Sequence, residues 1–169
     1  MTRNTHFARL GFNAIADIGI IVIAHFKNPA RTHAAKLLLE ALTLQNHILI
    51  PVSAYLGAYI IMTEYLKLRS THVAKALLKT LSLESPAFYE EVPKGIAEKA
   101  IATASELKLS SWDTYLVELA KGLGIKKIYT IDRQLATKIE DVKVENPIPE
   151  NAMRKYHQYI RERVDGDLS

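Results

Sequence analysis

The sequence predicts one α/β domain with a central parallel sheet of about four or five strands and helices on both of its faces. Two observations lead to this fold class. Amphipathic helical segments alternate with short strands rich in β-branched residues, and no internal repeat or low-complexity linker divides the chain. The chain has 169 residues, of which 49% are hydrophobic, so it can bury one sizeable core.

The expected elements follow one another along the whole chain. The first is an apolar, β-branched run, "FNAIADIGIIVIAHF", of the kind that forms a strand buried on both faces, and Asp17 interrupts it. Ser53 after Pro51 marks the start of one helix. The other segments are expected as helices at residues 30–45, 53–68, 70–85, 94–109 and 112–121, and as strands at 47–52, 87–92, 127–131 and 142–147.

The stretch "LSSWDTYLVELAKGLGIKKIYTIDRQL" predicts a helix followed by a strand. Ser110 and Ser111 are good N-cap residues, Gly122 with Gly124 ends the helix, and Asp113 falls in its first turn. The following "KKIYTID" is typical of a strand.

Asp132 stands at the C-terminal end of that strand. A helix of about ten residues covers ~15 Å and a strand of about five covers ~16 Å, so the chain returns to the edge where the helix began. We therefore expect Asp113 and Asp132 to be neighbours. Either residue alone has a structural explanation, as a first-turn helix acid or as a turn residue. Together they favour a ligand site, because ligands bind at the carboxyl edge of open α/β sheets.

A third carboxylate belongs to the same edge. Asp17 is costly within an apolar strand unless it ends the strand or meets a partner. If the first strand ends near Asp17, its carboxylate joins those of Asp113 and Asp132. Three carboxylates repel one another strongly, and a hard cation such as magnesium or manganese would neutralise them.

Composition limits the other function classes. The net charge of +4 and pI of 9.2 permit a polyanionic partner without requiring one. The absence of cysteine excludes disulfides and thiolate metal sites and fits a reducing compartment. The opening "MTRNTHFARLGF" lacks a signal-peptide cleavage site, and the apolar run after it is too short to span a membrane.

Three motifs, taken together, resemble those of the PIN domain family. They are Asp17 after the first strand, "SSWDTYLVELA" with Asp113, and "YTIDRQL" with Thr130 and Asp132. The length and the element order are also similar to the stand-alone VapC-type toxins that cleave RNA.

The resemblance covers roughly residues 12–146 and leaves 147–169 as a C-terminal helical extension of a single PIN-like domain. It implies a magnesium or manganese site and endoribonuclease activity in which a metal-activated water attacks the phosphorus of RNA. It also implies a cytoplasmic protein with no membrane association, a homodimer, and a small antitoxin protein that covers the acidic groove.

The resemblance assigns roles to four residues. Asp17, Asp113 and Asp132 would be the catalytic, metal-binding carboxylates. Thr130, two residues before Asp132, would hydrogen-bond to these ligands from behind.

One part of the PIN pattern is missing. PIN domains normally carry a glutamate on the helix after the second strand, where this sequence has Gly57. Glu64 is the nearest acid on that helix, but seven residues place it ~10 Å along the axis, which makes it a poor substitute. Three alternatives remain open. The three aspartates suffice for one ion, another acid substitutes, or the protein is a catalytically impaired PIN-like unit that binds RNA or protein.

The helix "SAYLGAYIIMTEYL" also has two interpretations. Tyr55, Tyr59, Ile60 and Met62 are suited to packing against a twin helix in a dimer, and equally to lining the core.

Other enzyme classes match the sequence less well. The six histidines show no HExxH or other close ligand pairing, which argues against a zinc hydrolase. The "GLG" turn lacks the rest of a dinucleotide-binding fingerprint. A haloacid-dehalogenase-like phosphatase needs a second aspartate two residues after the first, where this chain has Gly19.

Overall fold

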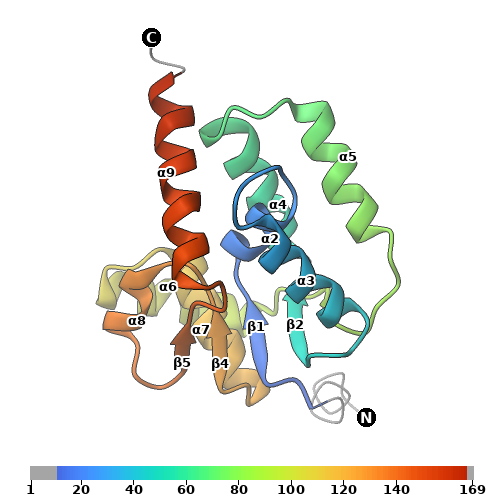
Figure 1. Cartoon of the computed structure of the whole chain (residues 1–169). Coiled ribbons are helices and arrows are strands. Elements are labelled where there is room, and N and C mark those ends of the chain that lie inside the picture. Colours follow the sequence, from blue (N-terminus) through green and yellow to red (C-terminus); the bar gives the residue numbers. More distant parts are fainter. Residues whose placement is uncertain (1–10, 167–169) are drawn as a thin grey trace.

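Five short parallel strands form the centre of the molecule in the computed structural model, which describes residues 11–166 (Figure 1). Their order in the sheet is β3-β2-β1-β4-β5, so the chain starts in the middle, builds one half and then crosses to build the other. The strands are β1 Ala14–Ala16, β2 Ile48–Pro51, β3 Phe88–Tyr89, β4 Lys127–Tyr129 and β5 Lys143–Glu145. The predicted parallel α/β fold is confirmed.

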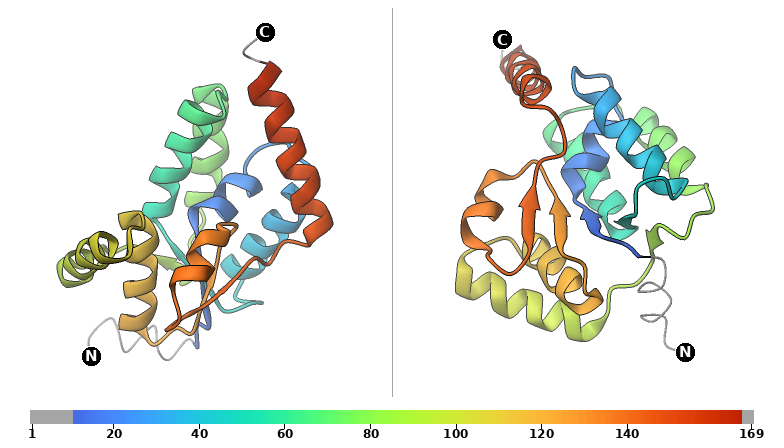
Figure 2. Two further views of the ribbon diagram at one scale, coloured as in Figure 1. Left: turned by 90° about the vertical axis from the view of Figure 1, so that its left-hand side faces the viewer. Right: turned by 60° about the horizontal axis from the view of Figure 1, so that its bottom comes forward.

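Helices cover both faces of this sheet (Figure 2). One apolar cluster contains Ala14, Ala16 and residues of α2, α3, α4, α5 and α9, and the other contains Ile15 and residues of α6, α7 and α8. This division follows from strand geometry, because successive side chains point to opposite faces. The helices are α2 Ile18–Ala24, α3 Arg31–Leu42, α4 Ser53–Ile60, α5 Ser70–Leu81, α6 Lys94–Leu107, α7 Ser111–Leu123, α8 Arg133–Lys138 and α9 Glu150–Gly166.

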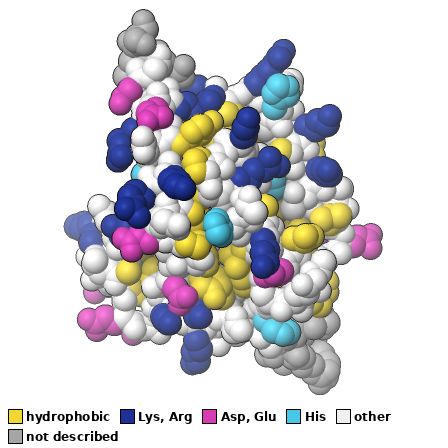
Figure 3. All heavy atoms as spheres, viewed as in Figure 1, with side chains coloured by type: hydrophobic (Ala, Val, Ile, Leu, Met, Phe, Trp, Pro, Cys, Tyr) yellow, Lys and Arg dark blue, Asp and Glu magenta, His cyan; other side chains and the backbone are white. Residues whose placement is uncertain are grey.

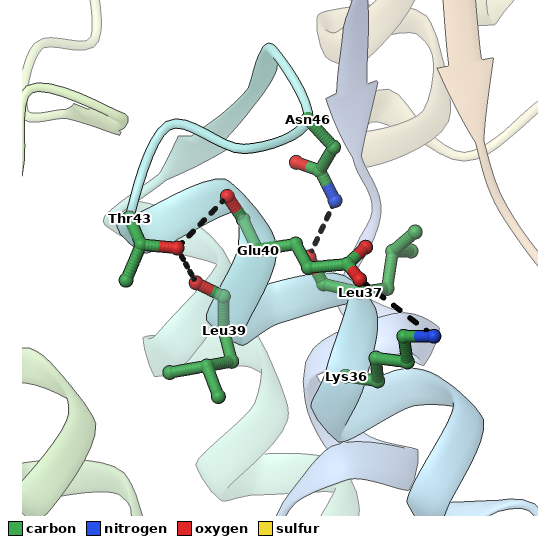
Figure 4. Close-up of polar contacts among 6 residues, drawn as sticks. All are labelled: Lys36, Leu37, Leu39, Glu40, Thr43 and Asn46. Carbon is green, nitrogen blue, oxygen red and sulfur yellow. Dashed lines mark hydrogen bonds and ion pairs between the residues drawn. The ribbon is translucent and has the colours of Figure 1, made fainter.

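The loop from α3 to β2 shows how short polar residues end a helix before a central strand (Figure 4). The Thr43 hydroxyl donates to the backbone oxygens of Leu39 and Glu40, at 2.8 and 3.4 Å. The Asn46 amide donates to the Leu37 oxygen at 2.9 Å. These side-chain bonds add to backbone bonds at the same helix end, where the Thr43 N–H donates to the Leu39 oxygen and the Gln45 N–H donates to the Glu40 oxygen, and the chain then turns into β2.

The first apolar run is divided between a strand and a helix. As expected, β1 ends directly before Asp17, and the run then continues as α2. Because the α2 residues Ile20 to Ala24 are all buried, the helix is apolar on every side and its sequence looks like that of a buried strand.

The segment predicted as one helix at residues 53–68 is interrupted. After α4 the chain forms a π-helical turn, η1 Ile61–Tyr65, in which the Leu66 N–H donates to the Ile61 oxygen at 3.0 Å. Of the apolar side chains on this segment, Tyr55 and Met62 belong to the core, whereas Tyr59 and Ile60 are exposed. Core packing is therefore confirmed for Tyr55 and Met62, whereas packing against a twin helix stays a prediction for Tyr59 and Ile60.

The C-terminal helix α9 lies on the same side of the sheet as α2. Ala152, Met153 and Tyr156 are buried against the larger apolar cluster, and the Arg163 Nε donates to the Leu66 oxygen at 3.1 Å. Among residues 11–166, no helix has the length and apolar character needed to cross a membrane. The sequence considered for a signal peptide lies mostly in residues 1–10, outside the described part.

Candidate functional site

Asp17, Asp113 and Asp132 come from three different elements at the carboxyl edge of the sheet. Asp17 follows β1 directly and is the N-cap of α2. Asp132 follows β4 and is the N-cap of α8. Asp113 lies in the first turn of α7, whose N-cap is Ser110. Each aspartate thus lies at the N-terminal end of a helix, where backbone N–H groups stabilise carboxylates.

The Asp17 carboxylate is held by three hydrogen bonds. Its Oδ1 accepts from the Ile18 backbone N–H at 2.6 Å and from the Trp112 indole N–H at 2.9 Å. Its Oδ2 accepts from the Thr130 hydroxyl at 2.6 Å. The side chain is only 6% exposed, so these bonds offset much of the free energy lost when the charge leaves water.

Thr130 connects two of the aspartates. The Thr130 hydroxyl donates to Asp17 and accepts from the Asp132 backbone N–H at 3.0 Å. Its backbone N–H also pairs with the Glu145 oxygen at 3.0 Å, which extends the pairing of β4 with β5. The pairing of β4 with β5 therefore fixes the position of Thr130, and the Thr130 hydroxyl holds the Asp17 carboxylate by a hydrogen bond. The sequence motif predicts a hydrogen bond of this kind.

Asp113 and Ser110 bond to each other at the start of α7. The Ser110 hydroxyl donates to Asp113 Oδ2 at 2.6 Å and accepts from the Asp113 backbone N–H at 3.1 Å. Asp132 uses Oδ1 to accept from the Gln134 backbone N–H at 2.8 Å. Within the described residues, Asp113 Oδ1 and Asp132 Oδ2 accept no hydrogen bond, so each has an oxygen available for a ligand.

Burial raises the pKa of the Asp17 carboxyl above its ordinary value of 3.8. The hydrogen bonds to Asp17 lower the pKa, and the charge of Asp132 raises it. Burial also raises the pKa of Asp113, with further increases from the charges of Asp17 and Asp132. Asp17 and Asp132 thus lie close enough to Asp113 for their charges to disfavour its ionisation.

The donor chemistry of these side chains fits a hard divalent cation. Carboxylate oxygens are the preferred ligands of magnesium and manganese, and a cation would relieve the repulsion that raises the pKa of Asp113. No three His, Cys, Asp or Glu side chains within residues 11–166 lie close enough together to hold one ion as they stand. A shared ion would therefore require side-chain rotation, most readily at the half-buried Asp113 and Asp132.

The comparison with protein families decides the classification. The PIN domain model matches residues 20–140, which include Asp113, Thr130 and Asp132 and begin just after Asp17. The chain belongs to the PIN domain family.

Two solved structures share this PIN fold. VapC20 of Mycobacterium tuberculosis, described as a sarcin-ricin loop cleaving toxin, is 13% identical with a TM-score of 0.56, and the similarity covers 78% of this chain and 99% of that one. A toxin-antitoxin complex from Klebsiella pneumoniae gives 16% identity and a TM-score of 0.54, over 80% of this chain and 98% of that one. At these identities the similarity concerns the fold. A search of curated proteins gave no significant match.

The glutamate expected in the PIN pattern is replaced by close apolar packing. A Cβ atom added to Gly57 would lie 2.6 Å from Cδ1 of Ile18, the residue that follows Asp17. Position 57 therefore faces the neighbourhood of Asp17, but a side chain there must displace Ile18. Glu64 is exposed in η1 and is not among the groups that shift the pKa of Asp17 or Asp113.

Sequence reasoning missed the role of Trp112. Its indole N–H donates to Asp17, and its ring lies 5.2 Å from the Tyr115 ring, centroid to centroid. The available signal was the position of Trp112 directly before Asp113 in "SSWD", on a helix that begins at the site. A small hollow of about 130 Å³ also opens beside the site, where Asp132, Arg133 and Glu145 are among its lining residues.

Proposed function

We propose that this PIN domain is a metal-dependent endoribonuclease of the VapC toxin type. The observation that carries the proposal is the gathering of Asp17, Asp113 and Asp132 from three elements at one sheet edge, within range of one another's charge. Membership of the PIN family supports it. The description of VapC20 as a sarcin-ricin loop cleaving toxin supports RNA as the substrate class.

In this proposal Asp17, Asp113 and Asp132 hold one or more magnesium or manganese ions. The ion would supply positive charge against the phosphate and would acidify water. Asp17 is the fixed ligand, because the hydrogen bonds from Thr130 and Trp112 prevent its carboxylate from rotating. Asp113 and Asp132 each offer a carboxylate oxygen without a partner among the described residues.

The most direct test is RNA cleavage by the purified protein. Single-stranded RNA should be cut in magnesium or manganese, and excess EDTA should stop the reaction. Asp17→Asn should lose at least ~100-fold in rate, since it removes a ligand charge at the centre of the site. Cleavage that persists in EDTA, or at the wild-type rate in Asp17→Asn, would show that these carboxylates do not carry the reaction.

The second candidate function is a catalytically impaired PIN-like unit that binds RNA or protein. The specific observation in its favour is that Gly57 takes the place of the usual glutamate and packs against Ile18, which a longer side chain would have to displace. The argument against it is the set of three aspartates. Mutually repelling carboxylates raise the free energy of the folded state, and a non-catalytic site has no use for them.

The proposal extends to partners and location. The exposed apolar side chains of Leu56, Tyr59, Ile60 and Tyr65 on α4 and η1 form a surface suited to a homodimer or to a small antitoxin. The fold similarity to a chain of a toxin-antitoxin complex supports the antitoxin. We place the activity in the cytoplasm, where RNA substrates are found.

Light scattering of the wild type and of Leu56→Glu tests the proposed homodimer. A charge buried between the two copies at this helix face should dissociate the dimer.

A further inference from the structure

A basic hollow lies beside the candidate site, on the surface between α8 and α9. Its volume is about 400 Å³, and the lining residues are Arg133, Glu150, Arg154, His157 and Arg161. Three guanidinium groups thus face one carboxylate. None of the three arginines forms an ion pair within residues 11–166, and their positive charge exceeds the charge of the one carboxylate in the lining. Figure 3 shows Lys and Arg side chains on the α9 side and across the rest of this face, with acidic side chains among them.

The sequence of α9 explains why this face is basic. Arg154, His157 and Arg161 stand at positions i, i+3 and i+7 and therefore share one face of the helix. Met153 and Tyr156 point the other way, into the core. A rise of 1.5 Å per residue spaces the three basic residues over ~10 Å along the axis. The result is a row of two arginines with a histidine between them, on a helix whose apolar face packs against the core.

Arg133 connects this hollow to the acidic site. It follows Asp132 in the sequence and lines both the basic hollow and the smaller hollow that contains Asp132. A polyanion lying along α9 would therefore reach the edge of the sheet at Asp132. The carboxylates themselves repel RNA, so RNA affinity has to come from cations nearby.

We propose that this face of α9 binds the phosphate backbone of single-stranded RNA and guides the strand to the candidate site. The inference rests on the proposed function. It names residues outside the carboxylate site that bind the substrate. Guanidinium groups match phosphate oxygens through paired N–H donors. None of the lining residues is apolar, whereas a docked peptide helix needs apolar anchors. The lining therefore favours a nucleic-acid backbone over an acidic protein segment.

The test is the salt dependence of RNA binding in EDTA, where no cleavage occurs. Fluorescence anisotropy with a labelled single-stranded RNA measures binding from roughly 50 to 200 mM salt. For Arg154→Gln with Arg161→Gln, the slope of log K against log salt should decrease in magnitude by about 1.4, since each single-strand phosphate contact contributes about 0.7. Over the fourfold change from about 50 to 200 mM salt, a slope difference of about 1.4 makes the affinity of the wild type fall about sevenfold more than that of the variant.

Matched variants separate position from net charge. Lys75→Gln with Lys99→Gln removes two charges from exposed side chains on α5 and α6 and should leave the slope near the wild-type value. Arg154→Lys with Arg161→Lys keeps both charges and should retain the slope, which also shows that the helix tolerates replacement. Circular dichroism melts verify that each variant is folded.

Three outcomes decide the inference. Equal slopes for the Arg→Gln pair and the Lys→Gln pair would overturn it. Tighter binding of a polyglutamate peptide than of RNA, with the same arginine dependence, would also overturn it and assign the face to an acidic protein. Arginine-dependent RNA binding without any cleavage in magnesium or manganese would support this inference and contradict the proposed nuclease.

Discussion

The two sides of β1 build the site in different ways. On the β4 side, Asp17 receives hydrogen bonds from Trp112 and Thr130, and the Thr130 hydroxyl also binds the Asp132 backbone. On the β2 side, Gly57 stands where the PIN pattern has a glutamate, and it packs against Ile18. Hydrogen bonds thus orient the Asp17 carboxylate on the β4 side, whereas apolar side chains fill the space on the β2 side.

This difference predicts which side of the site tolerates amino-acid substitutions and which does not. A polar network buried around a charge is sensitive to the loss of any member, because the remaining partners are left unsatisfied. Apolar packing at the end of a flexible side chain tolerates change if the neighbour can move. Substitutions on the β4 side should therefore have larger effects than those on the β2 side.

The largest effect is expected for Thr130→Val. This replacement keeps the shape of Thr130 but removes the hydroxyl that serves Asp17 and Asp132. The free energy of unfolding should fall by ~1–3 kcal/mol, because two buried polar groups lose a partner. Cleavage should fall by ~10–100-fold through loss of ligand orientation. Urea unfolding and RNA cleavage measure the two quantities.

Thr130→Ser is the matched control, since it restores the hydroxyl and should recover most of the cleavage rate. If Val and Ser behave alike in both measurements, the hydroxyl does not support the carboxylates and the comparison between the two sides fails.

Gly57→Glu probes the apolar side and should have an intermediate effect. Its Cβ would meet Ile18 Cδ1 at 2.6 Å, so overpacking should lower the free energy of unfolding by ~1–3 kcal/mol and outweigh the gain of up to ~1 kcal/mol from replacing a helical glycine. In an Ile18→Ala background the strain should disappear, and the added carboxylate should then raise manganese affinity and ribonuclease activity.

Melting temperature, manganese affinity and cleavage should be compared for Gly57→Ala and Gly57→Glu in both backgrounds, as a double-mutant cycle. Should Gly57→Glu be tolerated in the Ile18→Ala background while affinity and cleavage stay unchanged, position 57 does not face the ion and the PIN pattern has been misaligned on this helix.

The smallest effect is expected in the pH dependence of stability without metal. The folded-state pKa of Asp113 lies above 3.8, because burial and the charges of Asp17 and Asp132 disfavour ionisation. The contribution of Asp113 to stability is therefore fully present below pH 3.8 and is lost as pH rises through the folded-state pKa. Asp113→Asn does not titrate, so at neutral pH this variant should be as stable as the wild type or more stable.

Urea unfolding in EDTA, from below pH 3.8 to neutral pH, measures the difference in the free energy of unfolding between the wild type and Asp113→Asn. A variant that is strongly destabilised at neutral pH would make Asp113 a structural residue, held for its bond to Ser110.

Local chemistry explains which parts were predictable from sequence. The helix α7 begins one residue before the predicted start and ends two residues after the predicted end, and its caps are the predicted ones, Ser110 and Gly124, which adopts a positive φ of 70°. The parallel sheet followed from alternation of helices and strands. Strand ends were less accurate. β4 stops at Tyr129, two residues before the expected end, because Asp132 caps a six-residue helix, α8, that the sequence did not predict.

The features that the sequence did not predict depend on contacts between residues far apart in the chain. The Trp112 bond to Asp17 joins residues 95 positions apart, and the Thr130 bond joins residues 113 apart. The position of Trp112 before Asp113 places it near the site, but no local pattern identifies Asp17 as its partner. The apolar run after Asp17 is also ambiguous, because a fully buried helix and a buried strand have the same composition, and only the packing around α2 separates them.

Calorimetric titration with manganese tests the central claim most directly, because it measures the proposed ion without depending on the RNA target. The wild type should bind manganese, and Asp113→Asn should lose most of this affinity while remaining folded. Binding that is clear in the wild type and lost in the variant is the predicted result. No binding in millimolar metal, or equal binding by the two proteins, would contradict the account and favour the non-catalytic alternative.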